Sequence, residues 1–244
     1  SDPDNNYSLG KFFKDVNKAI RLITENKKIP ILVGGTMMYF NILSKGLSNL
    51  PSSDDEIRKK IERQAEAVGW PELHKKLSEV DPLSATKIKP NDKQRIQRAL
   101  EVIELTGKPL SKFFKDQKNT EDYNFFNISL FPNNRDRLYQ RINSRFSEML
   151  NDGLVDEVKG LLESTNLNSS NNSMKSIGYR EICVFLENKL SLKEAEHNAT
   201  MATRRLAKRQ ITWLRSIKDH NSYDIFEKNL IQKIQDLICQ EFKL

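Results

Sequence analysis

The sequence has few of the residues that hold small disulfide-bonded or metal-dependent folds together. Two cysteines, Cys183 and Cys239, occur among 244 residues, both in stretches of helical pattern, so neither a disulfide framework nor a zinc site is expected. The three histidines, His74, His197 and His220, lack metal-ligand spacing. No apolar run is long enough to cross a membrane and no signal peptide is visible. We therefore expect a protein of the reducing cytoplasm with no membrane partner.

Acidic residues are fewer than basic ones, 33 against 40, which gives a formal net charge of +7. A hydrophobic content of 37% is enough for a sizeable core, and a charged content of 30% indicates a helix-rich, charged surface. A positive excess of this size points to a polyanionic partner where the basic residues cluster.

The stretch from Ile29 to Phe40, IPILVGGTMMYF, predicts a short buried strand (Ile31 to Val33), a turn at Gly34-Gly35 and a helix that follows Thr36. Glycines let the backbone approach a ligand closely, and helix N-termini at the carboxyl end of a sheet favour anions. The same pattern is also common where a strand simply leads into a helix, with Thr36 as the N-cap. Both interpretations stay open on this stretch alone.

The order of elements predicts an α/β fold. Ser8 is expected to cap a helix that leads into the strand at residues 31–33. A helix that leads into a parallel strand follows an earlier strand of the same sheet. We therefore expect the chain to be incomplete at its N-terminus.

The pattern also predicts an all-helical insertion within this α/β core. Residues 1–51 are expected to form the first part of the core, residues 52–118 the insertion, and residues 119–244 the second part with C-terminal helices. Asn124 to Phe131 is aromatic and β-branched enough to return to the core as a strand. Helices of the insertion are expected to begin near Asp54, Pro71 and Asp92.

Three arginines lie in one row of a helix expected from Asn134 to Asn151. Arg137, Arg141 and Arg145 are four residues apart, beside an apolar stripe. Like charges at this spacing repel one another unless an anion neutralises them, and arginine is a frequent phosphate ligand. An acidic residue of this helix or of another element could instead supply the opposite charge.

Two later stretches have side chains suited to RNA. After an Asn/Ser-rich segment (Ser164 to Ser173), expected to be a mobile surface loop, a glycine precedes Tyr179 and Arg180, which could stack on a base and bind phosphate. On pattern alone, a packed tyrosine at a helix start is the favoured interpretation. The run from Arg204 to Arg215, RRLAKRQITWLR, has no acidic residue, and its one-signed basic face favours a nucleic-acid backbone.

In four places the sequence is similar to the bacterial tRNA dimethylallyltransferases, also called tRNA isopentenyltransferases. The stretches are, in chain order, LVGGTMMYF, PNDKQRIQRALEV, SIGYREI and ATRRLAKRQITWLR. The resemblance implies a P-loop kinase-like parallel-sheet core and an all-helical insertion that grips the tRNA anticodon stem-loop. It implies a monomer that transfers a dimethylallyl group from dimethylallyl diphosphate to N6 of adenosine 37, just 3′ of the anticodon. Mg²⁺ would accompany the diphosphate.

The resemblance also implies roles for individual residues. Thr36 would be the active-site contact near the flipped-out adenosine, and Arg145, with Arg141 one turn before it, would bind the diphosphate. The implied tRNA contacts are Thr36, Arg58, Gln94, Arg95, Ile96, Gln97, Arg98, Lys175, Ser176, Ile177, Gly178, Tyr179, Arg180, Lys208, Arg209, Gln210, Ile211, Thr212, Trp213, Leu214 and Arg215.

Two parts of the family pattern have no match in these residues: the P-loop G-x-x-x-x-G-K-[ST], and the aspartate that serves the family as general base. No residue of this chain is expected to ligate a metal. We therefore expect this polypeptide alone to be catalytically inactive and at best a weak tRNA binder. The alternatives are a non-catalytic tRNA-binding fragment and a related P-loop nucleoside or nucleotide kinase, which would not need the basic run.

Overall fold

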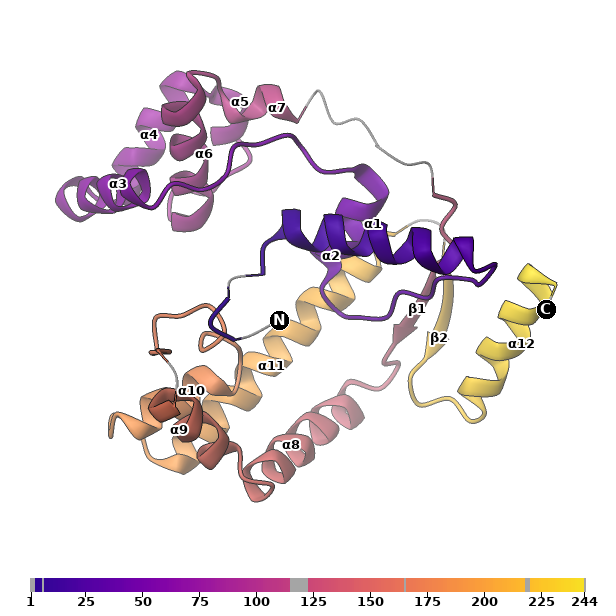
Figure 1. Ribbon diagram of the computed structural model, residues 1–244. Helices are drawn as coiled ribbons and strands as arrows, with labels where there is room; N and C mark the ends of the chain where they lie inside the picture. The colour runs from indigo at the N-terminus through magenta and orange to yellow at the C-terminus, as the bar shows by residue number, and fades with distance from the viewer. Residues whose placement is uncertain (1–2, 6, 115–122, 165, 218–219, 244) are drawn as a thin grey trace. The chain divides into compact units, whose positions relative to one another are not determined.

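The structure, a computed structural model, describes residues 3–5, 7–114, 123–164, 166–217 and 220–243. The chain divides into two compact units: the first unit joins residues 1–39 to residues 124–244, and the second unit is residues 40–123. The described residues are mostly helical, with one small parallel sheet of two strands (Figure 1).

Helix α1 (Leu9–Glu25) begins where the sequence predicts. The Ser8 hydroxyl accepts a hydrogen bond from the Lys11 N–H (3.2 Å) and so satisfies a donor of the first turn. Ile20 is buried on the inner face of the helix. The Phe12 ring stacks on that of Tyr39, with centroids 4.0 Å apart and planes 11° apart. This stack attaches α1 to the first turn of α2 (Met37–Lys45), the helix predicted after Thr36.

The buried strand predicted at residues 31–33 is not formed. Ile31 is 68% exposed and Val33 is 92% exposed, and residues 31–33 belong to no helix or strand. A strand requires a neighbouring strand to satisfy its backbone donors and acceptors, and none of the described residues supplies one at this place. The apolar run is therefore present, but the burial predicted from it is wrong for this structure.

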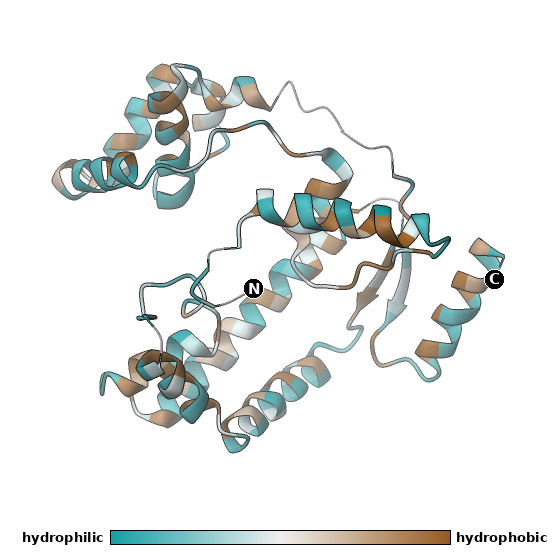
Figure 2. Ribbon diagram, viewed as in Figure 1, coloured by the Kyte–Doolittle hydropathy of each residue, from teal (hydrophilic) through white to brown (hydrophobic). Residues whose placement is uncertain are grey.

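Five helices are described in the second unit, and the first, second and fourth begin at or next to the predicted residues. Asp54 caps α3 and Asp92 caps α6, while Gly107 ends α6 in the left-handed conformation. Apolar and polar residues alternate along these helices, as in amphipathic helices that share a core (Figure 2). The helices are α3 (Asp55–Val68), α4 (Trp70–Val80), α5 (Pro82–Ala85), α6 (Lys93–Thr106) and α7 (Leu110–Phe113).

The core of the second unit is aliphatic. Leu77, Ile96 and Val102 are fully buried, and Trp70 packs against this core half-buried. The two short helices, α5 and α7, were not predicted, since one helical turn has no hydrophobic periodicity of its own.

The sheet of the first unit pairs two strands from distant parts of the chain. Strand β1 (Ile128–Phe131) lies within the predicted strand at residues 124–131. Strand β2 (Asn221–Asp224) runs parallel to it, with Leu130 opposite Tyr223. Strand β2 was not predicted because NSYD is polar and has low β-propensity, so pairing with β1 defines it.

The remaining helices of the first unit are amphipathic, and the first of them begins at the predicted Asn134. Asn134 caps α8 and Ser191 caps α11. Phe146, Val158, Met174, Ile182 and Ala199 form a core between α8, α9, α10 and α11. These helices and the last one are α8 (Arg135–Asn151), α9 (Leu154–Ser164), α10 (Tyr179–Leu186), α11 (Leu192–Leu214) and α12 (Leu230–Phe242).

Two details of this core differ from the prediction. Leu167, inside the Asn/Ser-rich segment, is buried against the core, so this segment does contribute to packing. The helical spacing of the run from Arg204 to Arg215 predicts Leu206 on the buried side of α11, but Leu206 is 38% exposed. The buried residues of α11 are instead Ala195, Ala199 and Thr200 in its first half, whose small side chains let the helix approach the core closely.

Candidate functional site

The Gly34-Gly35-Thr36 turn lies at the start of α2 and is held by the neighbouring parts of the first unit. The Thr36 carbonyl accepts a hydrogen bond from the Tyr39 N–H (2.9 Å), which closes the first turn of the helix. The Gly35 carbonyl accepts one from the Gln210 side-chain amide of α11 (2.8 Å). The Thr36 side chain is exposed. The structure thus places Thr36 at the predicted helix N-terminus, where its side chain is exposed to solvent.

The arginine row of α8 borders an open pocket of about 460 Å³. Arg137 and Arg141 line it, and the Arg137 guanidinium lies 4.3 Å from the centre of the Phe226 ring. Arg145 is exposed but is not among the lining residues. Guanidinium groups beside hydroxyl and amide groups suit a phosphate-bearing ligand. The other lining residues are Gln140, Ser144, Ile225, Phe226 and Glu227.

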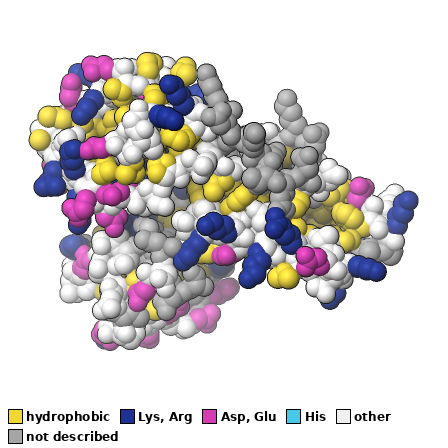
Figure 3. Space-filling model, turned by 45° about the horizontal axis from the view of Figure 1, so that its top comes forward, with side chains coloured by type: hydrophobic (Ala, Val, Ile, Leu, Met, Phe, Trp, Pro, Cys, Tyr) yellow, Lys and Arg dark blue, Asp and Glu magenta, His cyan; other side chains and the backbone are white. Residues whose placement is uncertain are grey.

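The C-terminal half of α11 presents basic side chains without acidic partners. Within the described ranges, none of Arg205, Lys208, Arg209 and Arg215 forms an ion pair, and all four are exposed. Trp213 is 44% exposed. We call these five residues the basic face of α11. On the face drawn in Figure 3, basic side chains stand in small groups with acidic ones between them.

Several other residues of this run contact the rest of the protein or their own helix. Arg204 donates to the Asn143 side chain (3.0 Å) and lies 4.8 Å from the centre of the Tyr139 ring, so it braces α11 against α8. Ile211 and Leu214 are half-buried. The Thr212 hydroxyl donates to the Lys208 carbonyl (2.9 Å) within the helix.

The segment from Lys175 to Arg180 leads into α10 and is mostly structural. Lys175 and Ser176 are exposed, and Ile177 is half-buried. The Tyr179 hydroxyl donates to the Glu157 carboxylate, and this hydrogen bond raises the pKa of Tyr179 to about 12. The packed tyrosine favoured by the pattern alone is therefore confirmed. Arg180 is held by an ion pair with its neighbour Glu181.

Gly178 has a backbone conformation that other residues rarely adopt. Its φ is +100°, and a Cβ there would meet the Phe146 ring at 3.4 Å. The buried Glu181 carboxylate accepts a hydrogen bond from the Gly178 N–H (2.9 Å), which closes the first turn of α10. The glycine of SIGYRE is thus required by local geometry.

The α6 segment of implied tRNA contacts has side chains on both sides of the helix. Gln94 and Arg95 are exposed, and Arg95 pairs with Asp92 (3.4 Å). Ile96 is fully buried, so its side chain belongs to the core of the second unit and does not reach RNA. Gln97 is half-buried and donates to the Glu62 carboxylate (2.9 Å).

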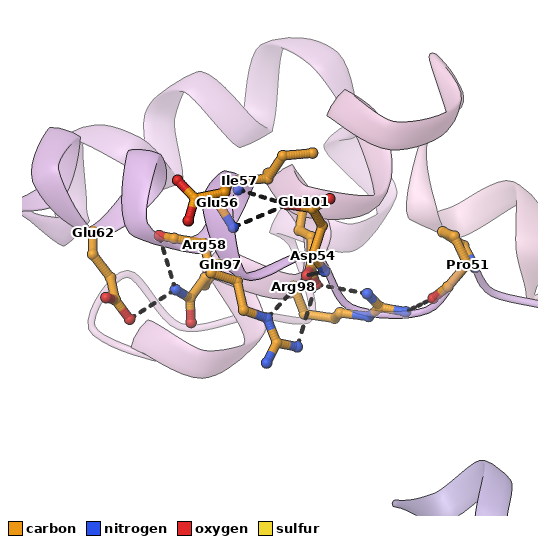
Figure 4. A network of polar contacts seen from close by, with 9 residues as sticks. All are labelled: Pro51, Asp54, Glu56, Ile57, Arg58, Glu62, Gln97, Arg98 and Glu101. Carbon is orange, nitrogen blue, oxygen red and sulfur yellow. Dashed lines mark hydrogen bonds and ion pairs between the residues drawn. The ribbon is translucent and has the colours of Figure 1, made fainter. Parts of the chain in front are cut away.

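Glu101 holds together Arg58 and Arg98 of the second unit (Figure 4). Its side chain is 0% exposed, and its carboxylate accepts hydrogen bonds from the Arg58 Nε (2.9 Å), the Arg98 Nη1 (2.6 Å) and the Asp54 N–H (2.8 Å). Arg98 also donates to the Pro51 carbonyl (2.6 Å). The Arg58 side chain remains 40% exposed. Two guanidiniums therefore share one buried carboxylate.

The pKa of Glu101 reflects two opposed effects. Burial alone would raise it, but the hydrogen bonds from Arg98, Asp54 and Arg58 outweigh burial and keep the pKa below its ordinary value. Sequence reasoning missed Glu101. The available signal was a glutamate three residues after Arg98 on the buried side of α6, where a carboxylate needs a cationic partner.

Among the described residues, no three His, Cys, Asp or Glu side chains lie close enough together to hold a metal ion by themselves. Mg²⁺ that accompanies a diphosphate is held mainly by phosphate oxygens and water with one or two carboxylates, so we assign no protein ligand to it. Across the same residues, no helix combines the length and apolar character required to cross a membrane.

Comparison with known proteins places the chain in a family. A family model described as IPP transferase matches residues 1–217. The chain is 46% identical over 238 residues to the tRNA dimethylallyltransferase of Nitrosomonas europaea, covering 97% of this chain and 75% of that protein. It is 42% identical to the tRNA dimethylallyltransferase of Coxiella burnetii, covering 97% of this chain and 79% of that one.

Solved structures agree with the sequence relatives. The crystal structure of the Bacillus halodurans tRNA isopentenylpyrophosphate transferase is similar with a TM-score of 0.63 and 34% identity, covering 97% of this chain and 73% of that one. A eukaryotic dimethylallyltransferase solved in crystallographic snapshots acting on tRNA is similar with a TM-score of 0.75 and 28% identity, covering 98% of this chain and 64% of that one. The chain belongs to the IPP transferase family.

Proposed function

We propose that this protein transfers a dimethylallyl group from dimethylallyl diphosphate to N6 of the adenosine 3′ of the anticodon, position 37, in tRNA. The observation that carries the proposal is the 46% identity to a tRNA dimethylallyltransferase over 97% of the chain. On this proposal the protein works in the cytoplasm, where tRNA is found, and its core is P-loop kinase-like.

The basic face of α11 is the surface that we propose for the tRNA backbone. Lys208, Arg209 and Arg215 are exposed and have no acidic partner in the part of the chain that the structure describes, so their charge is available to phosphates. Trp213 offers an exposed ring on which an unpaired base could stack. Lys175, Ser176 and Arg180 lie at the surface before and in α10 and are proposed as further contacts.

The second unit contributes its own proposed tRNA contacts. Arg58 and Arg98 are held by Glu101, and pre-positioned guanidiniums lose less conformational entropy when they bind phosphate. Gln94 and Arg95 are the exposed polar residues of the α6 segment. We propose these four as contacts and exclude the side chain of Ile96.

The pocket beside α8 is the proposed place of the diphosphate. In the reaction, the bond between the allylic carbon and the diphosphate oxygen breaks and a bond from that carbon to the adenine N6 forms. Negative charge develops on the leaving oxygens, where Arg141 of the pocket wall and Arg145 one turn later would stabilise it. The N6 proton must pass to a base, since the adenine amine is a weak nucleophile. We assign that base to no residue of this sequence.

A transfer assay tests the proposal. Radiolabelled dimethylallyl diphosphate is incubated with unmodified tRNA that has adenosine at position 37, and with a matched tRNA that has guanosine there. The chain Ser1–Leu244 is compared with the longest product that its gene encodes. We expect the longest product to label only the adenosine tRNA. Salt-sensitive binding of both tRNAs without any transfer would instead support a non-catalytic RNA-binding protein.

Two variants of α8 test whether the pocket beside this helix binds the diphosphate. Arg141→Ala should lower the rate of transfer by about a hundredfold, the usual effect of removing one stabilising donor from a developing oxyanion. Arg135→Ala is the matched control, since Arg135 belongs to the same helix but does not line the pocket, and it should stay within about twofold of the native rate. Equal losses in both variants would contradict the role of the pocket.

A further inference from the structure

Gln210 of α11 and Gly35 of the turn form a contact across 175 residues of sequence. The Gln210 Nε2 donates to the Gly35 carbonyl oxygen at 2.8 Å. A Cβ on residue 35 would lie 2.5 Å from that nitrogen, closer than atoms can approach. An alanine at position 35 would therefore push the amide away and break the hydrogen bond. Glycine at position 35 thus leaves room for the Gln210 amide beside the turn.

This hydrogen bond orients Thr36. The Gly35 carbonyl and the Thr36 N–H belong to one planar peptide unit, in which they point in opposite directions. Fixing the carbonyl oxygen with Gln210 therefore also fixes the direction of the Thr36 N–H. The stack of Tyr39 on Phe12 holds the chain three residues later, so the turn is attached to α11 on one side and to α1 on the other.

Gln210 differs from its neighbours in the basic run. Lys208 and Arg209 are exposed and have no acidic partner among the described residues, whereas Gln210 is half-buried and its amide is engaged by the backbone of the turn. An amide already bonded to the protein is less available to RNA than an open cationic side chain.

We propose that Gln210 is a positioning residue of the transfer reaction, and that it acts by orienting the Gly35–Thr36 peptide rather than by contacting tRNA. The inference rests on the proposed function, in which Thr36 contacts the target adenosine. It gives α11 two separate tasks: its basic face binds the RNA backbone, and Gln210 holds the residue that meets the reacting base.

The first test uses Gln210→Met in the longest chain that the gene encodes. Methionine keeps the length of the side chain and its helix propensity but has no donor. Gln232→Met in α12 is the matched control, because that exposed amide bonds Asp236 within its own helix. We expect Gln210→Met to speed hydrogen exchange of the amides at residues 35–39 about fivefold and to lower kcat at saturating tRNA about tenfold. The tRNA Kd and all properties of the control should stay within about twofold.

Three results would separate the possibilities. A weaker tRNA Kd with unchanged kcat would overturn the proposal and make Gln210 an RNA contact. Unchanged exchange at residues 35–39 would overturn it as well, since the turn would then not depend on the amide. If the native enzyme transfers no label, the proposed function fails. Faster hydrogen exchange at residues 35–39 in Gln210→Met would still support the role of the Gln210 amide in holding the turn.

A double-mutant cycle tests the dependence between the two residues. Gly35→Ala in the native background should lower kcat about tenfold, because it displaces the amide. In a Gln210→Ala background the same change should cost less than about twofold, because the shortened side chain leaves room for the new methyl group. Gly160→Ala, at a glycine with open space around it, controls for the loss of backbone freedom that any change from glycine to alanine brings. Additive effects of the two substitutions would contradict the proposal.

Discussion

Glu101 is a fully buried charge in the second unit, and its removal should strongly destabilise this unit. Glu101→Gln leaves two guanidiniums and the Asp54 N–H without their common anion. Breaking a buried ion pair from one side costs about 3–5 kcal/mol. We expect a loss of about 3 kcal/mol in the free energy of unfolding of this unit, measured by urea denaturation followed by circular dichroism.

Glu104 offers the matched control on the same helix. It pairs with Lys60, but both side chains are exposed, and such pairs contribute about 0–1 kcal/mol. Glu104→Gln should therefore change the free energy of unfolding by less than about 1 kcal/mol. A similar loss of unfolding free energy in Glu101→Gln and Glu104→Gln would show that burial does not determine how much Glu101 stabilises the unit.

Acid should weaken the second unit through Glu101 and Asp81. Burial would raise the pKa of Asp81, but hydrogen bonds from Ser84 and Ser111 outweigh it, and both carboxyls have a lowered pKa in the folded state. Their stabilisation is present above the ordinary pKa values of 4.5 and 3.8 and is lost as the pH falls through the lower folded values. Urea midpoints measured between pH 6 and pH 2 should fall most steeply below about pH 4. In Glu101→Gln the fall should be shallower.

At the scale of single elements, the start of α10 depends on Gly178. Any other residue must adopt φ of +100° and place its Cβ against the Phe146 ring. Gly178→Ala should lower the free energy of unfolding of the first unit by about 1–3 kcal/mol, measured by thermal and urea unfolding.

Gly160→Ala is the control for this substitution. Gly160 lies inside α9, where an added methyl group would meet only open space, and alanine there should stabilise by about 0.5–1 kcal/mol. A neutral or stabilising Gly178→Ala would mean that the turn before α10 can rearrange.

The elements that the sequence predicted well are those with local signals. Ser8, Asp54 and Asp92 cap helices through their own side chains, and Gly107 ends one by its own conformation, so a window of a few residues contains the cause. Strands need partners elsewhere in the chain. The apolar residues 31–33 have none among the described residues, and β2 becomes a strand only through pairing with β1.

The residues of the candidate site also divide into those with a local sequence signal and those that depend on distant partners. The basic face of α11 is visible in the sequence because its residues are neighbours on one helix. The contact of Gln210 with Gly35 and the cluster around Glu101 join residues that are 175 and up to 47 positions apart, and no local pattern encodes them. Motif spacing can assign a segment to RNA, but it does not separate side chains that face RNA from those that hold the segment in place.

At the scale of the whole molecule, the net charge of +7 and the basic face of α11 predict salt-sensitive tRNA binding. Lys208→Ala and Arg209→Ala should each weaken binding and reduce the slope of log Kd against log salt by about one. Lys193→Ala, in the first turn of the same helix and outside the basic face, is the control and should leave the slope unchanged. Filter-binding assays at about 50 to 200 mM salt measure this slope. Equal slopes in all variants would place the RNA elsewhere.

The two tryptophans give each unit its own fluorescent reporter. Trp70 is half-buried against the core of the second unit, while Trp213 is exposed on the basic face of α11 in the first unit. A nucleobase stacked on Trp213 should quench its emission and leave that of Trp70 unchanged. In a Trp213→Phe variant the remaining signal reports unfolding of the second unit alone. Optical titrations could thus follow occupancy by RNA and loss of structure as separate signals, without an added dye.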